Sequence, residues 1–207
     1  MSEYKDYGYK TEEYNHIHSY LLEPLLANLA KPKNTKILDV GCGNGWLTNI
    51  LIDNGFDVYG TDASESGIAI ARKKNPDKFF LQDLAKEELP VELQGIKFDT
   101  IISTEVIEHL YAPRKYLEFC KKVLKKTGGG ELIISTPYHG YLKNVALSLF
   151  GKLDNHFTVL WDGGHIKFWS KKSLTKALEE QGFRITNFKG CGRIPWLWKS
   201  MIVKGEI

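Results

Sequence analysis

The first regular pattern in the chain is an amphipathic segment near its start. Between Tyr14 and Ala30, leucine and isoleucine residues recur three and four positions apart, and this spacing predicts an α-helix. Lys31 and Pro32 follow at once, and a proline often stands just beyond a helix because it cannot continue one. We therefore expect a helical cap within residues 1–35, in front of the main fold.

Short apolar runs then alternate with helical patterns up to about residue 137. The helical patterns cover Trp46–Asn54, Glu65–Asn75 and Pro113–Lys126. This alternation predicts parallel strands joined by right-handed helical crossovers, so that helices cover both faces of an open α/β sheet. The strands are expected in the runs KILDV, DVYGTD, KFFLQD, FDTIIS and GELIIST.

The alternation stops after the fifth apolar run. Residues 138–165 are too many for an ordinary connection of an α/β unit and too apolar for a solvated linker, which predicts an insertion with structure of its own. Such an insertion could form a lid, or its apolar side chains could simply enlarge the core. Beyond it, Ser170–Gln181 predicts a helix ended by Gly182, and FRITNF and WKSMIVKG predict a final antiparallel strand pair.

Composition limits the chain to a few classes of protein. With 207 residues and 43% hydrophobic content the chain can bury one sizeable core, so residues 1–207 are expected to form a single domain. Lys and Arg exceed Asp and Glu only by 28 to 25, which gives no reason to expect a nucleic acid as a partner. Three cysteines form no CxxC pair, the N-terminus has no leader-like apolar region, and no apolar run approaches the roughly 20 residues that span a bilayer. These features predict a soluble cytoplasmic protein.

A glycine-rich loop follows the first predicted strand, in the sequence ILDVGCGNGW. Its spacing is GxGxG, whereas a dinucleotide-binding turn has GxGxxG, and here Trp46 stands where the third small residue would be. Asp39 precedes Gly41 by two residues, and its charge would repel a pyrophosphate at the start of the next helix. These residues disfavour a nicotinamide dehydrogenase and favour a ligand that has an ammonium group and no phosphate.

Two further acidic residues end the second and third predicted strands. Asp62 stands where an acidic residue of such sheets commonly holds the two hydroxyls of a ribose. Asp83 could accept a hydrogen bond from an adenine amino group, with Leu84 in apolar contact with the ring. Singly, each of these acidic residues could instead cap a helix or begin a loop. Together with Asp39 they outline an amino acid, a ribose and an adenine, which are the parts of S-adenosylmethionine.

The sequence resembles the class I S-adenosylmethionine-dependent methyltransferases. The resemblance covers about residues 36–137 and lies in LDVGCGNG, GTDAS, LQDL, FDTIISTEVIEHL and GGGELIISTP. It implies a seven-stranded, Rossmann-like sheet with the last strand antiparallel, a donor across the strand ends, and an acceptor under a lid from the N-terminal helix and the insertion. The residues expected to bind the donor are Asp39, Gly41, Cys42, Gly43, Asn44, Gly45, Asp62, Ala63, Asp83, Leu84 and Ser103.

An acidic segment, STEVIEHL, follows the fourth predicted strand. If it is helical, Glu105, Glu108 and His109 share one face, where together with His165 they could ligate Mg²⁺ or another divalent cation. The segment resembles a histidine-bearing stretch of two metal-using branches of the family, the O-methyltransferases of ubiquinone biosynthesis and the 3′-terminal ribose methyltransferases of small RNAs. Alternatively no metal binds: the glutamates favour a helix start through its dipole, or Glu105 and His109 are catalytic, with His109 as a general base.

These residues predict an enzyme that transfers a methyl group to a hydroxyl oxygen of a small molecule, such as a phenol, a quinol or a sugar. A phenol has a pKa of about 10, so a base or a Lewis acid must help to remove its proton near neutral pH. Three alternatives stay open: methylation of an RNA-terminal ribose, metal-independent N-methylation, and binding of the donor without catalysis. The insertion, over residues 141–160, could cover an apolar acceptor or rest on a membrane surface.

Overall fold

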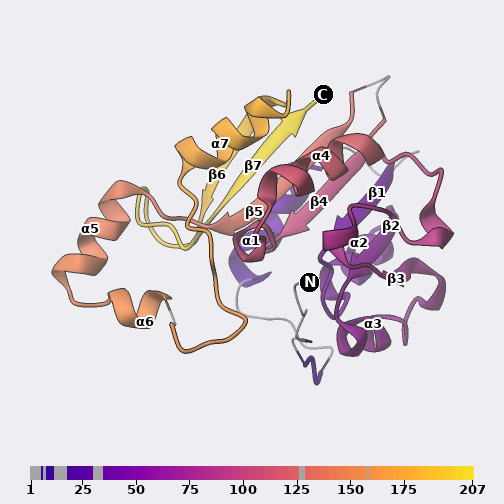
Figure 1. Ribbon diagram of the computed structural model, residues 1–207, viewed down its shortest axis with the longest axis horizontal. Helices are drawn as coiled ribbons and strands as arrows, with labels where there is room; N and C mark the ends of the chain where they lie inside the picture. Colours follow the sequence, from indigo (N-terminus) through magenta and orange to yellow (C-terminus); the bar gives the residue numbers. More distant parts are fainter. Residues whose placement is uncertain (1–5, 7, 12–17, 30–34, 126–128, 158) are drawn as a thin grey trace.

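The described part of the chain forms one sheet of seven strands with helices around it (Figure 1). The structure is a computed structural model that describes residues 6, 8–11, 18–29, 35–125, 129–157 and 159–207. The strand order is β3-β2-β1-β4-β5-β7-β6; β1 to β5 pair in parallel, and β7 is antiparallel to both of its neighbours. The predicted open α/β sheet with its last strand antiparallel is therefore confirmed. The strands are β1 (Lys36–Val40), β2 (Asp57–Asp62), β3 (Phe79–Leu81), β4 (Thr100–Thr104), β5 (Glu131–Pro137), β6 (Arg184–Cys191) and β7 (Ser200–Glu206).

The central strands are buried along almost their whole length. In β4 the first four residues are buried, and in β5 every residue after Glu131 is buried. Continuous burial is typical of parallel strands that helices cover on both faces. It explains why a run such as GELIIST is almost free of charges, and each of the five predicted runs coincides with or overlaps an observed strand.

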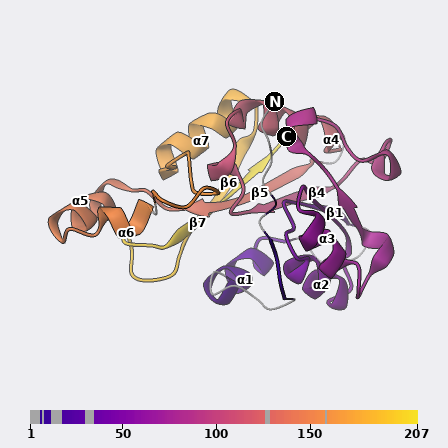
Figure 2. The same ribbon diagram turned by 60° about the horizontal axis from the view of Figure 1, so that its bottom comes forward.

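Helices lie on both faces of the sheet. Figure 2 shows α1 and α2 on one face and α4 and α7 on the other. On the first face Leu25 of α1 and Leu51 of α2 belong to one buried cluster; on the second, Leu117 of α4 and Leu174 of α7 belong to another. The helices are α1 (His18–Leu26), α2 (Trp46–Asp53), α3 (Glu65–Ala71), α4 (Pro113–Val123), α5 (Tyr141–Leu149), α6 (Leu153–Phe157) and α7 (Lys171–Glu180).

Two helices differ in extent from their predicted patterns. α3 ends at Ala71 rather than at Asn75, because Pro76 disfavours helical backbone at the residue before it, and Asn75 has φ −134° and ψ 78°. α1 is helical from His18 and ends at Leu26, before the predicted Ala30, because residues 27–29 form turns. The predicted start at Tyr14 and Ala30 itself lie outside the described residues.

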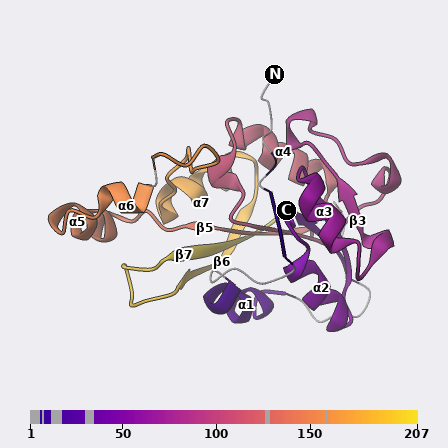
Figure 3. The same cartoon turned by 90° about the horizontal axis from the view of Figure 1, so that it is seen from below.

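The insertion contains two short helices, α5 and α6, that extend away from the sheet (Figure 3). The alternative that the insertion enlarges the core is wrong for most of its apolar side chains. Tyr141, Leu149, Phe150 and Leu160 are 79%, 78%, 74% and 96% exposed. Tyr138, at the start of the insertion, is the exception, because it is buried. None of the helices in the described segments has the length and apolar character needed to cross a bilayer.

Candidate active site

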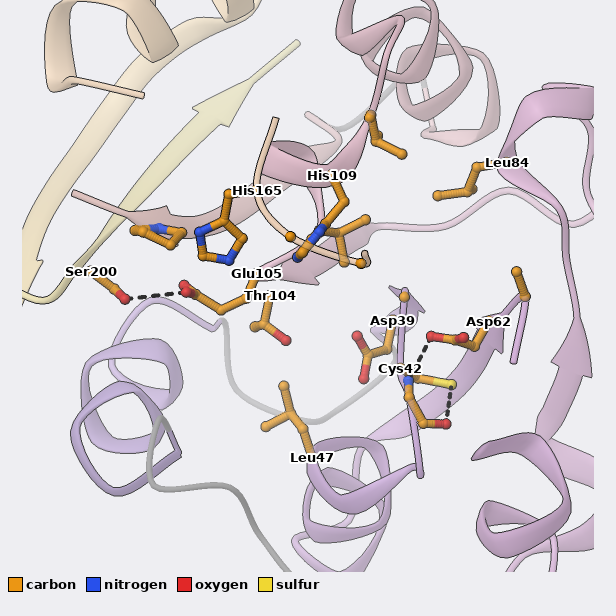
Figure 4. A pocket seen from close by; sticks show the side chains of 18 of the residues that line it. Asp39, Cys42, Leu47, Asp62, Leu84, Thr104, Glu105, His109, His165 and Ser200 are labelled. Atoms are coloured by element: carbon orange, nitrogen blue, oxygen red, sulfur yellow. Dashed lines mark hydrogen bonds between the residues drawn. The ribbon is translucent and has the colours of Figure 1, made fainter. Parts of the chain in front are cut away.

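A large cavity follows the carboxyl ends of the central strands (Figure 4). Asp39, Gly41 and Asp62 line one end, and Glu105 and His165 line the other. Its volume is about 1610 Å³, which exceeds the about 300–1,000 Å³ of a typical site for one ligand. The cavity therefore has room for two ligands side by side, at the edge where open α/β sheets bind them.

Asp39, at the end of β1, is a buried carboxylate with one unpaired oxygen. Its side chain is fully buried, and its Oδ2 accepts a hydrogen bond of 2.6 Å from the hydroxyl of Thr48 on α2. Its Oδ1 has no hydrogen-bond partner among the described residues. Burial raises the pKa of Asp39 to about 7. A cationic ligand group in the cavity would supply both the missing hydrogen bond and the missing opposite charge.

Asp62, at the end of β2, holds the glycine loop in place. Its Oδ2 accepts the N–H of Gly43 and its Oδ1 accepts the N–H of Ser64, both at 2.8 Å. A carboxylate oxygen can accept two hydrogen bonds, so each oxygen still has capacity for a ligand hydroxyl. Ala63, the next residue, also lines the cavity.

The glycines of the loop make room for side chains of the protein itself. A Cβ on Gly41 would lie 2.2 Å from Val106, and a Cβ on Gly43 would lie 2.5 Å from the Tyr9 hydroxyl. Gly45 does not line the cavity; it caps α2 with φ 75°, and a Cβ there would meet Phe79. Close packing around this turn therefore requires small residues even before a ligand binds.

The residues expected to contact the adenine lie at the open side of the same end. Asp83 and Leu84 line the cavity, and one oxygen of Asp83 accepts the N–H of Ala85, so that Asp83 caps the short 3₁₀ turn Leu84–Lys86. Asn44 also lines the cavity and donates from its amide to the carbonyl of Thr11. One oxygen of Asp83 therefore holds the start of the loop, as the alternative interpretation expected, and the other oxygen stays available for a ligand.

Cys42 and Ser103, two other residues expected to contact the methyl donor, do not present a charged group to the cavity. Cys42 lines the cavity, but burial raises the pKa of its thiol well above the ordinary value, so the sulfur stays protonated. Ser103 is fully buried on β4 and is not among the lining residues, whereas Thr104 is. Successive side chains of a strand point to opposite faces, which is why Thr104 lines the cavity and its neighbour Ser103 does not.

A segment near the N-terminus, which no sequence pattern marked, lies at the end of the cavity with Asp39 and Asp62. Gly8, Tyr9, Lys10 and Thr11 line the cavity. The N–H of Tyr9 donates to the hydroxyl of Ser66, and Asp6 accepts from the hydroxyls of Ser64 and Ser66 at the start of α3. The segment is polar and lacks helical or strand periodicity, so no sequence pattern predicts its position at the cavity.

Glu108, His109 and His165 form a group at the other end of the cavity. One ligand atom of each lies within 4.8 Å of the other two. Glu108 is 1% exposed, and its Oε2 accepts a hydrogen bond of 2.9 Å from the Thr136 hydroxyl. Its Oε1 lies 4.0 Å from Nε2 of His165 and has no hydrogen-bond partner among the described residues. The N–H groups of Ile166 and Lys167 both donate to the backbone carbonyl of Glu108, which fixes the loop that carries His165.

Glu105 lies apart from this group, which corrects the expectation of a shared helical face. It has φ 55°, and only Ile107–His109 form a 3₁₀ turn. Its N–H still donates to the carbonyl of Ser135 on β5, so the backbone cannot yet turn into a helix. Its carboxylate accepts from the hydroxyls of Ser135 at 2.9 Å and Ser200 at 3.3 Å, and burial raises its pKa.

The two histidines of the group are held neutral by their surroundings. Burial lowers the pKa of His109. Burial, and next the charge of His109, lowers the pKa of His165 to about 4. The rings lie edge to face, with centroids 4.9 Å apart, and Trp161 of the insertion packs against His109 at 5.9 Å. Two neutral imidazoles and a buried carboxylate therefore face a common point.

The fold and the cavity define an α/β protein of the open-sheet class, with room for two ligands at the carboxyl ends of its strands. The chain belongs to a methyltransferase domain family, whose model matches residues 14–187. The ubiquinone biosynthesis O-methyltransferase of Dinoroseobacter shibae is 33% identical over 165 residues, which cover 76% of this chain and 63% of that protein. The same enzyme of Roseobacter denitrificans is 32% identical over 182 residues, which cover 83% of this chain and 71% of that protein.

Solved structures share the fold. Magnesium protoporphyrin IX methyltransferase from Synechocystis PCC 6803, with bound S-adenosylhomocysteine, matches with a TM-score of 0.65 and 23% identity over 90% of this chain and 80% of that one. An S-adenosylmethionine-dependent methyltransferase from Mesorhizobium loti matches with a TM-score of 0.68 and 20% identity over 89% of this chain and 96% of that one. The predicted methyltransferase class is thus confirmed.

Proposed function

We propose that this methyltransferase acts on a hydroxyl oxygen of a small phenolic or quinol acceptor. The observation that carries the proposal is the group of Glu108, His109 and His165 at the end of the cavity away from Asp39 and Asp62, where the two histidines line the cavity and Glu108 lies buried behind them. A phenol with a pKa of about 10 must lose a proton to become a good nucleophile, whereas a neutral amine already has a free lone pair. The O-methyltransferases that this chain resembles support the same acceptor class.

The donor is assigned to the end with Asp39 and Asp62. The unpaired Oδ1 of Asp39 would accept a hydrogen bond from the donor ammonium, and Asp62 would accept from the ribose hydroxyls. Gly41, Gly43 and Asn44 form the wall between them. The sulfonium would then point along the cavity toward Glu108, and since it already has a good leaving group, the protein mainly aligns the displacement and excludes water.

Glu108, His109 and His165 fit a divalent cation. The buried, unpaired Oε1 of Glu108 is the kind of atom that a metal would satisfy, and the three ligand atoms need to approach only a little further. Two imidazoles and one carboxylate suit Zn²⁺, Mn²⁺ or Fe²⁺ better than Mg²⁺, which prefers oxygen ligands. When bound, such a cation would act as a Lewis acid toward the acceptor hydroxyl. Thr136 would hold the other oxygen of Glu108 in place.

Without a metal, the same residues suggest acid–base catalysis. His109 is neutral and lines the cavity, so it could take the acceptor proton directly. Glu105 also lines the cavity, but its hydrogen bonds to Ser135 and Ser200 suit it to hold β4, β5 and β7 together at this end. In this alternative His109 is the catalytic base and Glu105 is a positioning residue.

Transfer to oxygen can be tested with simple acceptors. The protein is incubated with S-adenosylmethionine and either catechol or benzylamine, and the products are identified by mass spectrometry. We expect S-adenosylhomocysteine and the monomethyl ether of catechol in equal amounts. Methylation of benzylamine alone would contradict the proposal and favour N-methylation. Methylation of the 3′ end of an RNA oligonucleotide, with none of catechol, would favour the RNA alternative.

The insertion is proposed to act as a lid that rests on a bilayer surface on the cytoplasmic side. Trp161 lines the cavity while the nearby Leu149 and Phe150 are exposed, so one segment has both a cavity wall and an apolar outer surface. Exposed apolar side chains on a short amphipathic helix are typical of interfacial contacts, and they would bring an apolar quinol to the site. The three free, buried cysteines are as expected in a reducing compartment.

Replacement of Leu149 and Phe150 by serine should reduce binding to phosphatidylcholine vesicles by at least about tenfold, because two apolar side chains no longer enter the interface. Co-sedimentation with the vesicles measures the bound fraction. Val91→Ser removes an apolar side chain that is 79% exposed at a distant turn, and it should leave binding unchanged. Equal binding of all three proteins would contradict the membrane contact.

A further inference from the structure

A buried lysine from the insertion lies in the wall of the cavity. Lys143, on α5, is only 4% exposed although its helix extends away from the sheet (Figure 1). Its ammonium donates to the backbone carbonyl of Lys199, just before β7, at 3.3 Å, and both residues line the cavity. An ammonium group can donate three hydrogen bonds, so one long bond to a carbonyl leaves most of its capacity unused.

No carboxylate of the described residues lies within ion-pair distance of this ammonium. The two buried acids at this end already have other partners, because Ser135 and Ser200 donate to Glu105 and Thr136 donates to Glu108. Glu105 attracts the Lys143 ammonium across the cavity without direct contact. A buried charge without a direct ion pair is costly, and an anionic ligand between such groups would lower that cost. Burial, and next the charge of Arg193, lowers the pKa of Lys143 to about 8, and the attraction of Glu105 only partly opposes this shift.

Two more groups with hydrogen bonds to donate line the same part of the cavity. Arg193 is in the turn between β6 and β7, and among the described residues its guanidinium has neither an ion pair nor a hydrogen bond. His156 is on α6, and its Nε2 is buried without a hydrogen-bond partner. Burial, followed by the charges of Lys143 and Arg193, lowers the pKa of His156, and all three side chains line the cavity.

We propose that Lys143, Arg193 and His156 form a subsite for an anionic group of the acceptor, a carboxylate or a phosphate. The inference rests on the proposed function for the location of the acceptor, and it adds that the acceptor carries a negative charge away from the reacting hydroxyl. The three residues come from α5, α6 and the β6–β7 turn, none of which carries a residue of the donor end. An anion there would pair with two cations and satisfy the free nitrogen of His156.

Matched acceptor analogues test this subsite without any need for turnover. The protein loaded with S-adenosylhomocysteine is titrated by calorimetry with 3,4-dihydroxybenzoate and with the uncharged 3,4-dihydroxybenzamide. We expect the benzoate to bind at least about tenfold more tightly, because charge-assisted hydrogen bonds are lost in the amide. The affinities of phenyl phosphate and phenol are compared in the same way. The pair with the larger ratio of charged to uncharged affinity shows whether the subsite prefers a carboxylate or a phosphate.

In Lys143→Met the benzoate-to-benzamide ratio should fall to below about threefold, while the affinity for the benzamide stays within about twofold of wild type. Arg193→Met, at an exposed position, should also lower this ratio. Lys152→Met removes an exposed lysine of the same insertion and should leave the ratio unchanged.

Two results would overturn the subsite. Wild-type protein that binds neither charged analogue more tightly than its neutral partner has no such site. Weaker binding of S-adenosylhomocysteine in Lys143→Met, with an unchanged benzoate ratio, would assign the cations to the donor carboxylate instead. Absence of methyl transfer to catechol together with an intact benzoate ratio would reject the proposed function alone, since binding is measured separately from transfer.

Discussion

Replacing Asp39 by asparagine is expected to stabilise the folded protein and to weaken binding of S-adenosylhomocysteine by about tenfold to a hundredfold. The carboxylate is fully buried, and only one of its oxygens has a hydrogen bond. Asparagine keeps an oxygen for the Thr48 hydroxyl and removes the charge, so the ligand-free protein gains stability. The donor product loses the opposite charge for its ammonium group.

The effect of Asp39 should depend on pH in a defined direction. Burial raises its pKa from 3.8 to about 7 in the folded protein. The folded state therefore binds this proton more tightly than the unfolded state, and the stability that Asp39 contributes below about pH 4 is lost as the pH rises to about 7. Above that range the Asp39→Asn protein should be more stable than wild type by about 2–4 kcal/mol.

Ligand affinity should follow the opposite course. Wild-type protein must release the Asp39 proton before the carboxylate can pair with the ligand ammonium, so its affinity should rise from about pH 5.5 to about pH 7.5. Urea unfolding and calorimetric titration at several pH values measure the two quantities. Asp77→Asn makes the same change at an exposed position and should alter neither. An affinity of Asp39→Asn equal to that of wild type at pH 7.5 would contradict the role of Asp39 at the donor ammonium.

The second large effect is expected from Glu108→Gln. If Glu108, His109 and His165 hold a divalent cation, the loss of the only charged ligand should weaken binding of Zn²⁺ or Mn²⁺ and lower methyl transfer to catechol by about a hundredfold or more. Glutamine keeps the size of the side chain and can still accept the hydrogen bond from Thr136. The change therefore tests charge and ligation more than packing.

Metal binding is measured by calorimetry on protein freed of metal with a chelator, and transfer is measured before and after the metal is restored. Glu118→Gln changes an exposed glutamate on α4 and should behave as wild type. Full activity in the chelator, with the same metal affinity in Glu108→Gln and wild type, would reject the metal. It would leave His109 as the candidate base.

The sequence alone was sufficient to predict the strands of the sheet and the position of Asp39 and Asp62 at the strand ends. Buried parallel strands read as apolar runs, and Asp39 and Asp62 stand directly at the ends of two such runs, which must meet at one edge of the sheet. It was insufficient for Glu105, because the break in the backbone at φ 55° depends on a hydrogen bond to β5. A similar difficulty arises at Ser103 and Thr104, because neighbouring residues of a strand point to opposite faces and the sequence does not say which of the two faces the cavity.

The residues missed altogether come from segments without periodicity. Tyr9 reaches the cavity from a polar segment near the N-terminus, and Lys143 and Arg193 reach it from an insertion and a turn that are 50 positions apart in the sequence. Their proximity follows from tertiary packing, which neither spacing nor composition reports. The fixation of His165 by the Glu108 carbonyl is a long-range contact of the same kind.

Donor and acceptor contacts reside on parts of the chain that can vary independently. Asp39 and Asp62 belong to strands whose pairing would be disrupted by any change in length, whereas α5, α6 and the β6–β7 turn leave the sheet beyond its last paired residues. Insertions and deletions are tolerated far better in such excursions than within paired strands. Selection can therefore retune which molecule is methylated by remodelling these excursions, while the machinery that supplies the methyl group stays the same.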